Sequence, residues 1–163
     1  MRKALSLLLA GTMAASMMIG SAVTANAASD MKIAMVTDYG DITDQSFNQT
    51  TYEACKAFAE ENGYDFTYKK PATDSDADRE SSIEEAVEEG YNVVVLPGYA
   101  FAKAIVDVAP TYPDAKFIGL DVSEFDLNSA NGENEFKEDN VYCAVYQEEL
   151  PGFMAGYAAV KLG

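Results

Sequence analysis

One short stretch of the sequence, VTDYGDITDQSFNQ at residues 36–49, gathers groups that could bind a small molecule. Three carboxylates, Asp38, Asp41 and Asp44, stand within seven positions, and the tripeptide Ser-Phe-Asn follows at 46–48. Carboxylate oxygens accept hydrogen bonds, and an aromatic ring offers a flat surface for stacking. The stretch therefore favours a ligand that donates hydrogen bonds and has a planar face.

Helix capping is the alternative explanation for this turn. Asp44 or Thr43 would cap the helix that follows, and Phe47 would be the first core residue of that helix. If the turn binds a ligand, a phosphate is a poor candidate, because acidic side chains repel the anion that a helix N-terminus otherwise attracts. A nucleoside, which carries hydroxyls and ring N–H groups, suits the turn better than a nucleotide.

The elements that must position this turn are alternating strands and helices. Apolar runs predict strands at 32–37, 64–68, 92–96, 116–120 and 141–146. Helical spacing predicts helices from 47 to Gly63, around 83–90, from about 100 to Pro110, and over 152–162, whereas the polar segment 123–139 is predicted to be a loop. This alternation predicts an α/β fold, a doubly wound parallel sheet.

Polar and aromatic residues follow the predicted strand ends. They are Asp38, Gly98, Tyr99, Asp121 and, after the last strand, Gln147 and Glu148. Ligands of open parallel sheets bind beyond the carboxyl ends of the strands. We therefore expect these side chains on one rim, together with Phe47.

The composition of the chain excludes several kinds of partner and active site. The net charge of −16 argues against nucleic acid and anionic lipid as partners. The chain has no histidine, which excludes a His-based triad and His-ligated zinc. We expect no cofactor. Cys55 and Cys143 are predicted to be buried small hydrophobes, although export would also permit a disulfide.

The first 27 residues have the pattern of a signal peptide. Arg2 and Lys3 precede an uncharged stretch at 4–23, and Ala-Asn-Ala at 25–27 predicts cleavage before Ala28. A membrane anchor is the competing interpretation, which the Gly, Ser and Thr residues in the stretch disfavour. We therefore expect an exported, soluble protein, and no cysteine beside the cleavage site offers a point for lipid attachment.

A second acidic cluster admits two interpretations. Asp74, Asp76, Asp78 and Glu85 match positions of a calcium-loop template, but Arg79 stands where the template needs glycine. The simpler interpretation is a solvated loop that caps the second helix. We therefore predict no metal site.

The chain resembles the basic membrane protein family, the nucleoside-binding substrate-binding proteins of ABC importers. The resemblance rests on VTDYGDITDQSFNQ, on TDSDADRESSIEEAVEEGYNVVVLPGYAFAKAI, on PDAKFIGLD and on YQEELPGFMAGYAA, in that order from about Lys32 onward. It implies a two-lobed periplasmic-binding-protein fold of type I with the ligand clasped between the lobes.

The resemblance also implies residue roles. Asp38 and Asp121 would hydrogen-bond a nucleobase, Phe47 would stack on it, and Ser46 and Asn48 would lie close by. With the rim residues included, the predicted ligand-binding set is Asp38, Tyr39, Asp44, Ser46, Phe47, Asn48, Gly98, Tyr99 and Asp121.

Members of that family usually carry a lipid-anchoring cysteine, which this sequence lacks at the expected place. By the resemblance, residues 28–147 form the N-terminal lobe, and 148–163 begin a second lobe whose remainder is absent, so the chain is either a fragment or a half-protein. The expected function is extracytoplasmic capture of a purine or other nucleoside, near the plasma membrane, for an ABC permease, without catalysis. The alternatives are a sensory module of the same fold and, less favoured, a secreted α/β enzyme that uses the aspartates.

Overall fold

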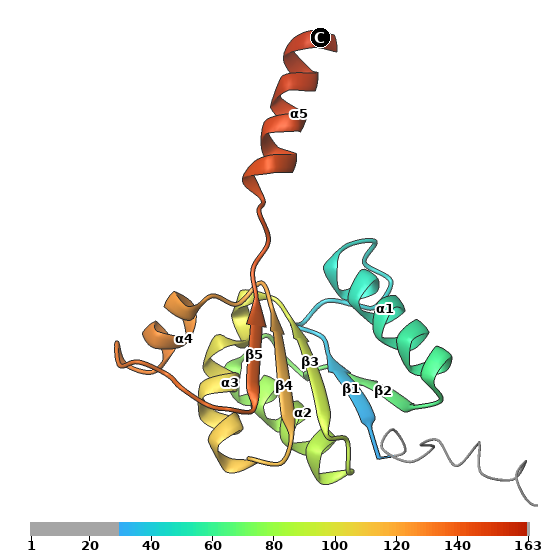
Figure 1. Cartoon of the computed structure of the whole chain (residues 1–163), viewed down its shortest axis with the longest axis vertical. Coiled ribbons are helices and arrows are strands. Elements are labelled where there is room, and N and C mark those ends of the chain that lie inside the picture. Colours follow the sequence, from blue (N-terminus) through green and yellow to red (C-terminus); the bar gives the residue numbers. More distant parts are fainter. Residues whose placement is uncertain (1–29, 163) are drawn as a thin grey trace, which may run out of the picture. The chain divides into compact units, whose positions relative to one another are not determined.

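The computed structural model describes residues 30–162, so the predicted signal peptide at 1–27 lies outside the described residues. A five-stranded parallel sheet has the order β2-β1-β3-β4-β5, with β2 at one edge and β5 at the other (Figure 1). The strands are β1 (Lys32–Val36), β2 (Asp65–Lys69), β3 (Val93–Pro97), β4 (Lys116–Leu120) and β5 (Val141–Ala144). The predicted parallel α/β sheet is confirmed, and the last strand ends two residues earlier than expected.

An α-helix follows each strand in the sequence. The helices are α1 (Phe47–Asn62), α2 (Asp76–Glu88), α3 (Ala102–Val108), α4 (Glu124–Ala130) and α5 (Glu149–Leu162), with 3-10 turns at Tyr99–Phe101 and Ala109–Thr111. α1 ends at Gly63, as predicted, because Gly63 adopts the left-handed conformation (φ 72°) that closes a helix. Pro151 lies in the first turn of α5, where its missing N–H costs nothing.

The prediction of a continuous polar loop at 123–139 was wrong, because α4 lies within it. Ser123 and Asp126 form a capping box. The Ser123 hydroxyl accepts the Asp126 N–H at 3.1 Å, and the Asp126 carboxylate accepts the Ser123 N–H at 2.8 Å. Leu127 is the buried residue of this short helix. The capping pair was visible in the sequence, but a single buried side chain gave no helical periodicity.

The two faces of the sheet bury different side chains, since successive residues of a strand point to opposite faces. One core packs alternate strand residues against α2, α3 and α4, and its members include Val36, Ile83, Val94, Leu96, Ile105, Phe117 and Leu127. The other core is small and places Ile33 and Val95 against Ala59 of α1. Each fully buried side chain such as Phe117 contributes roughly 1.5–3 kcal/mol to folding. The sheet therefore owes most of its support to the α2–α3–α4 face.

The α1 face remains partly open. A hollow of about 440 Å³ lies there, lined mainly by apolar residues that include Met31, Phe58 and Ile118. Helix α5 buries none of its residues, and Phe153 and Val160 are 73% and 83% exposed. Helix α5 therefore presents apolar side chains on its surface. Within residues 30–162, no helix is both long and apolar enough to cross a bilayer.

The two cysteines are free and half-buried. Cys55 packs with the core under α1, and Cys143 packs with the core under α3 and α4. Burial raises the pKa of the Cys55 thiol to about 11. The interpretation of both residues as small hydrophobes holds in part, since each keeps some exposure, and they do not form a disulfide.

Candidate ligand-binding site

Asp38 is the first residue after the buried Thr37 at the end of β1. Its Oδ1 accepts the main-chain N–H groups of Tyr39 and Gly40 and the amide of Asn48, the last at 2.9 Å. Among the described residues, none donates a hydrogen bond to Oδ2. Asp38 thus holds one oxygen inside the protein and leaves the other available to a ligand.

The pKa of Asp38 lies below its ordinary value. Burial alone would raise this pKa, but the hydrogen bonds from Gly40, Asn48 and Tyr39 and the positive charge of Arg79 outweigh burial. Asp38 is therefore a carboxylate at neutral pH, and it accepts hydrogen bonds.

Asn48 connects the two carboxylates of the turn. It is 5% exposed. Its Nδ2 donates to Asp38 Oδ1 and, at 3.0 Å, to Asp44 Oδ2, while its Oδ1 accepts the Asp38 N–H at 3.3 Å. A Cβ at Gly40 would lie 2.4 Å from Nδ2, so the close approach requires glycine at 40. Both ends of the Asn48 amide bond to Asp38 or Asp44, so Asn48 stabilises the turn that holds these two aspartates.

Asp44 caps α1, as the alternative interpretation held. Its Oδ1 accepts the N–H groups of Ser46 at 2.7 Å and Gln49 at 3.2 Å, which would otherwise lack partners at a helix start. The same residue also joins the Asn48 network through Oδ2. Thr43 instead donates to Asp41. Ser46 occupies the N-cap position and is exposed, but its side chain makes no capping bond.

Main-chain hydrogen bonds join the remaining strand ends. The Gly98 N–H donates to Leu120 O at 2.7 Å, and the Asp121 N–H donates to Ala144 O at 2.6 Å. Gly98 has φ 117°, and a Cβ there would lie 4.0 Å from Asp38 Oδ2. The ends of β1, β3, β4 and β5 therefore form one continuous edge, as the strand-end argument expected.

Asp121 meets a second carboxyl group at this edge. It adopts a left-handed conformation (φ 60°) directly after β4. The charge of Asp121, a hydrogen bond with it and slight desolvation raise the pKa of Glu148, which precedes α5. This contact agrees with the prediction that Glu148 lies on the same rim of the sheet as Asp121.

The aromatic residues differ in their contacts. Phe47, the first residue of α1, is half-buried, and its ring meets Tyr146 edge to face with 6.0 Å between ring centroids. Tyr39 and Tyr99 are 52% and 71% exposed. The structure thus brings Asp38, Asp44, Asn48 and Gly98 into one connected group, while Tyr99 joins none of the contacts described above.

Sequence reasoning did not assign Arg79 to the site. Arg79 is 6% exposed, and its Nε donates to the carbonyl oxygen of Asp38 at 3.1 Å. Its guanidinium also pairs with Asp74 and, at 3.2 Å, with Asp76. The spacing of Asp76 and Arg79 on a helix was a usable sign of that ion pair. The contact with Asp38, 41 residues away, had no sign in the sequence.

The calcium-template aspartates have other partners. Asp74 and Asp76 pair with Arg79, and Asp78 accepts the hydroxyl of Thr73. The loop caps α2 as the simpler interpretation held, although the capping side chain is Ser75, which accepts the Asp78 N–H at 3.2 Å. No metal-binding group of acidic or cysteine side chains occurs within residues 30–162.

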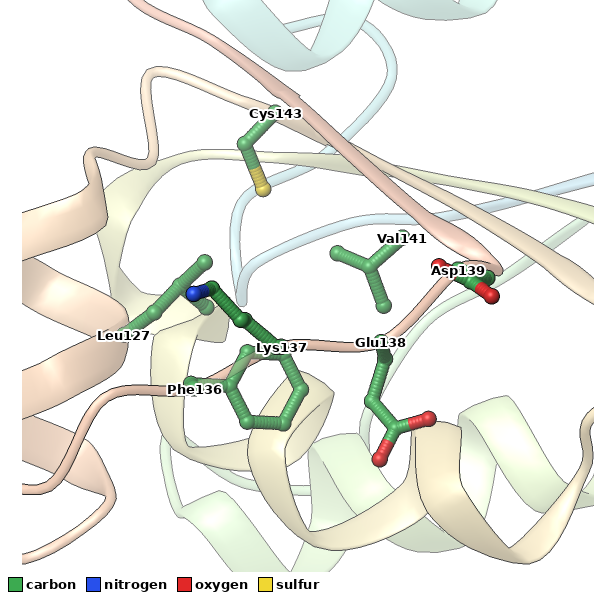
Figure 2. Close-up of a pocket in the computed structure, with 7 residues that line it drawn as sticks. All are labelled: Leu127, Phe136, Lys137, Glu138, Asp139, Val141 and Cys143. Atoms are coloured by element: carbon green, nitrogen blue, oxygen red, sulfur yellow. The ribbon is translucent and has the colours of Figure 1, made fainter.

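A separate hollow of about 400 Å³ lies beside β5, and none of the predicted site residues lines it. Figure 2 shows Val141 and Cys143 of β5 pointing toward Leu127 and Phe136, with Lys137 and Glu138 beside them. Val141, Cys143 and Phe136 pack against the larger core. This hollow is therefore a depression over that core, distinct from the strand-end edge.

Known proteins similar to this chain include binding proteins of ABC transporters. The nucleoside-binding protein BmpA of an ABC transporter in Lactococcus lactis is 27% identical over 136 residues, which cover 81% of this chain and 35% of that protein. An uncharacterised lipoprotein of Pyrococcus abyssi is 29% identical over 145 residues, 88% of this chain and 34% of its own. The chain thus spans about a third of the length of these relatives.

A solved structure is also similar to this chain. An ABC transporter solute-binding protein of Aeropyrum pernix K1 superposes with a TM-score of 0.60 at 27% identity, over 72% of this chain and 29% of that one. The Lactococcus and Aeropyrum proteins are both described as binding proteins of ABC transporters. Residues 31–162 match the family described as ABC transporter substrate-binding protein PnrA-like, and the chain belongs to this family.

Proposed function

We propose that this chain forms the ligand-binding N-terminal lobe of an extracytoplasmic substrate-binding protein that captures a nucleoside for an ABC permease. The observation that carries the proposal concerns Asp38 at the strand-end edge: Tyr39, Gly40 and Asn48 hold its Oδ1, while Oδ2 accepts no hydrogen bond from the described residues. An ionised oxygen held in this way accepts a base N–H or a hydroxyl. Carboxylates arranged to accept such donors disfavour analogues that lack them.

The second contribution is stacking. Phe47 begins α1 three residues after Asp44, and its ring contacts Tyr146 edge to face. A nucleobase offers a flat face to this ring and N–H groups to Asp38 and Asp121. Tyr39, Ser46, Gly98 and Tyr99 complete the proposed contact set. The Lactococcus relative is named a nucleoside-binding protein, and this name supports a nucleoside as the ligand.

The proposed mechanism is closure of two lobes over the ligand. Residues 28–147 would supply one lobe, and 148–163, which include α5, would begin the other. A ligand that contacts both lobes stabilises the closed form because it binds that form more tightly. The predicted signal peptide and the relationship to a lipoprotein support a location outside the cytoplasm, close to the permease.

Isothermal titration of inosine, guanosine, adenosine and ribose tests the proposal. The titrated protein is the product of the whole reading frame after signal-peptide removal, with the 163-residue chain alongside. Micromolar or tighter binding of a nucleoside, with ribose much weaker, is the expected result. Binding of none of the four compounds by either protein would overturn the nucleoside assignment.

A further inference from the structure

Arg79 is a buried cation beneath the edge site. It lies in the first turn of α2, and its side chain is 7% exposed. Its guanidinium holds oxygens from two separate segments: the carbonyl of Asp38 at the end of β1, and the carboxylates of Asp74 and Asp76 at the start of α2. A guanidinium is planar with its donors in fixed directions, so these contacts define the position of one segment against the other.

The Asp38 carboxylate depends on the main chain that carries it. Oδ1 is fixed by Tyr39, Gly40 and Asn48, which all belong to the same turn. The bond from Arg79 to the carbonyl of Asp38 comes from outside the turn and ties residue 38 to α2. Without this bond, the turn and the Asp38 carboxylate could shift together relative to Gly98. Such a shift would matter for binding, because the groups of a binding site must be held within about 0.5 Å of their productive positions.

We propose that Arg79 is a positioning residue for the ligand site, which holds the Asp38 backbone so that Oδ2 faces the edge beside Gly98 without itself contacting ligand. This inference takes the identity of the ligand, a nucleoside, from the proposed function. The positioning role itself is argued from the contacts of Arg79. The charged groups around Asp38 are Arg79 from α2 and Asp44 from the turn before α1, the latter linked through Asn48.

The contrasting explanation is that Arg79 only neutralises the acidic start of α2. Lys69 provides a matched control, because it also ties α2 to a strand end. It pairs with Glu85 at 3.1 Å and Glu89 at 2.8 Å, and its side chain is 17% exposed. Lys69→Gln therefore removes a cation of β2 that pairs with Glu85 of α2 and with Glu89, and it leaves the bond from Arg79 to the carbonyl of Asp38 in place.

The test compares wild type, Arg79→Gln, Arg79→Lys and Lys69→Gln in the product of the whole reading frame. Inosine affinity is measured by calorimetry, thermal stability by circular dichroism, and the pKa of the Asp38 carboxyl by carbon NMR without ligand. Arg79→Gln should weaken inosine binding on the order of tenfold and raise the pKa of Asp38. Arg79→Lys should largely retain the low pKa of Asp38, because the positive charge remains. It should lose inosine affinity, because an ammonium lacks the planar guanidinium donors that bond both segments. Lys69→Gln should alter neither.

Asp74→Asn/Asp76→Asn serves if Arg79→Gln does not fold, since it removes the charges that anchor the guanidinium and leaves Arg79 in place. This variant should also weaken inosine binding. Unchanged affinity and an unchanged Asp38 pKa in a folded Arg79 variant, or unchanged affinity in the double variant, would overturn the positioning role. If wild type binds no nucleoside, the proposed function fails, while the NMR measurement still tests the coupling between Arg79 and Asp38.

Discussion

The ring of Phe47 meets the ring of Tyr146 edge to face, with an interplanar angle of 80° and 6.0 Å between centroids. Phe47 begins α1, and Tyr146 lies two residues beyond β5. The contact therefore joins the acidic turn after β1 to the segment that leads to α5. Such a pair contributes about 0.5–1.5 kcal/mol beyond the burial of its surface, and it restricts the orientation of both rings.

Replacing Phe47 with alanine should weaken nucleoside binding by about tenfold to a hundredfold. The reason is the loss of base stacking, which is worth roughly 1–3 kcal/mol per base. Phe47→Tyr keeps an aromatic face and should retain most of the affinity. Calorimetry on the product of the whole reading frame measures both variants. Phe125→Ala is the control, since Phe125 is 75% exposed on α4, and equal losses in the two alanine variants would exclude stacking at Phe47.

Replacing Asn48 with alanine should destabilise the lobe by about 1–3 kcal/mol, because Asp38 and Asp44 would each lose a part-buried hydrogen bond. Urea unfolding measures the change. Asn62→Ala is the matched control, since Asn62 is exposed at the end of α1 and its side chain donates to the carbonyl of Phe58. A cost for Asn48→Ala no greater than for Asn62→Ala would show that the network does not support the turn.

The sheet was predictable because its strands are short apolar runs separated by helical periodicity. Strands β3 and β4 are examples, since each is bounded by glycine, proline or aspartate that local sequence rules recognise. Helix α4 was not predicted because seven residues with one buried side chain give no periodic signal.

The site was predictable to the extent that strand ends define it. Asp38, Gly98 and Asp121 follow strands, so the topology alone brings them to one edge. The contacts among side chains were not predictable in the same way. Arg79 and Tyr146 reach the edge through tertiary packing with partners far away in the sequence, and the occupied amide of Asn48 depends on the path of the turn.

Replacing Gly98 with alanine should reduce both stability and nucleoside affinity. The backbone at Gly98 (φ 117°, ψ 146°) lies in a region that residues with a Cβ avoid, at a cost of roughly 1–3 kcal/mol. The new methyl group would stand beside Oδ2 of Asp38 and take space from a ligand. Gly63→Ala also strains a positive φ (72°) but has open space around it, so it should lose stability without losing affinity. Urea unfolding and calorimetry measure the two quantities, and equal affinity in both variants would contradict the prediction.

Acid should strengthen the contact between Asp121 and Glu148 and weaken ligand binding. The charge of Asp121 and the hydrogen bond with it raise the pKa of Glu148 in the folded protein. A raised folded pKa means that the stabilising contribution is fully present below the unfolded value of about 4.3 and is lost as pH rises through the folded value. Above the folded value Glu148 is a carboxylate, and the charge of Asp121 repels it.

The free carboxylates can then accept hydrogen bonds from a nucleoside, so affinity should rise as the pH rises through the raised folded pKa of Glu148. Asp38 does not oppose this trend, because its lowered pKa keeps it ionised. Carbon NMR of Glu148 should show a raised pKa in wild type that falls toward the ordinary value in Asp121→Asn. Asp114→Asn, which changes an exposed carboxylate before β4, should leave the Glu148 titration unchanged. An unshifted pKa of Glu148 in wild type would rule out the contact with Asp121 and the pH dependence that it predicts.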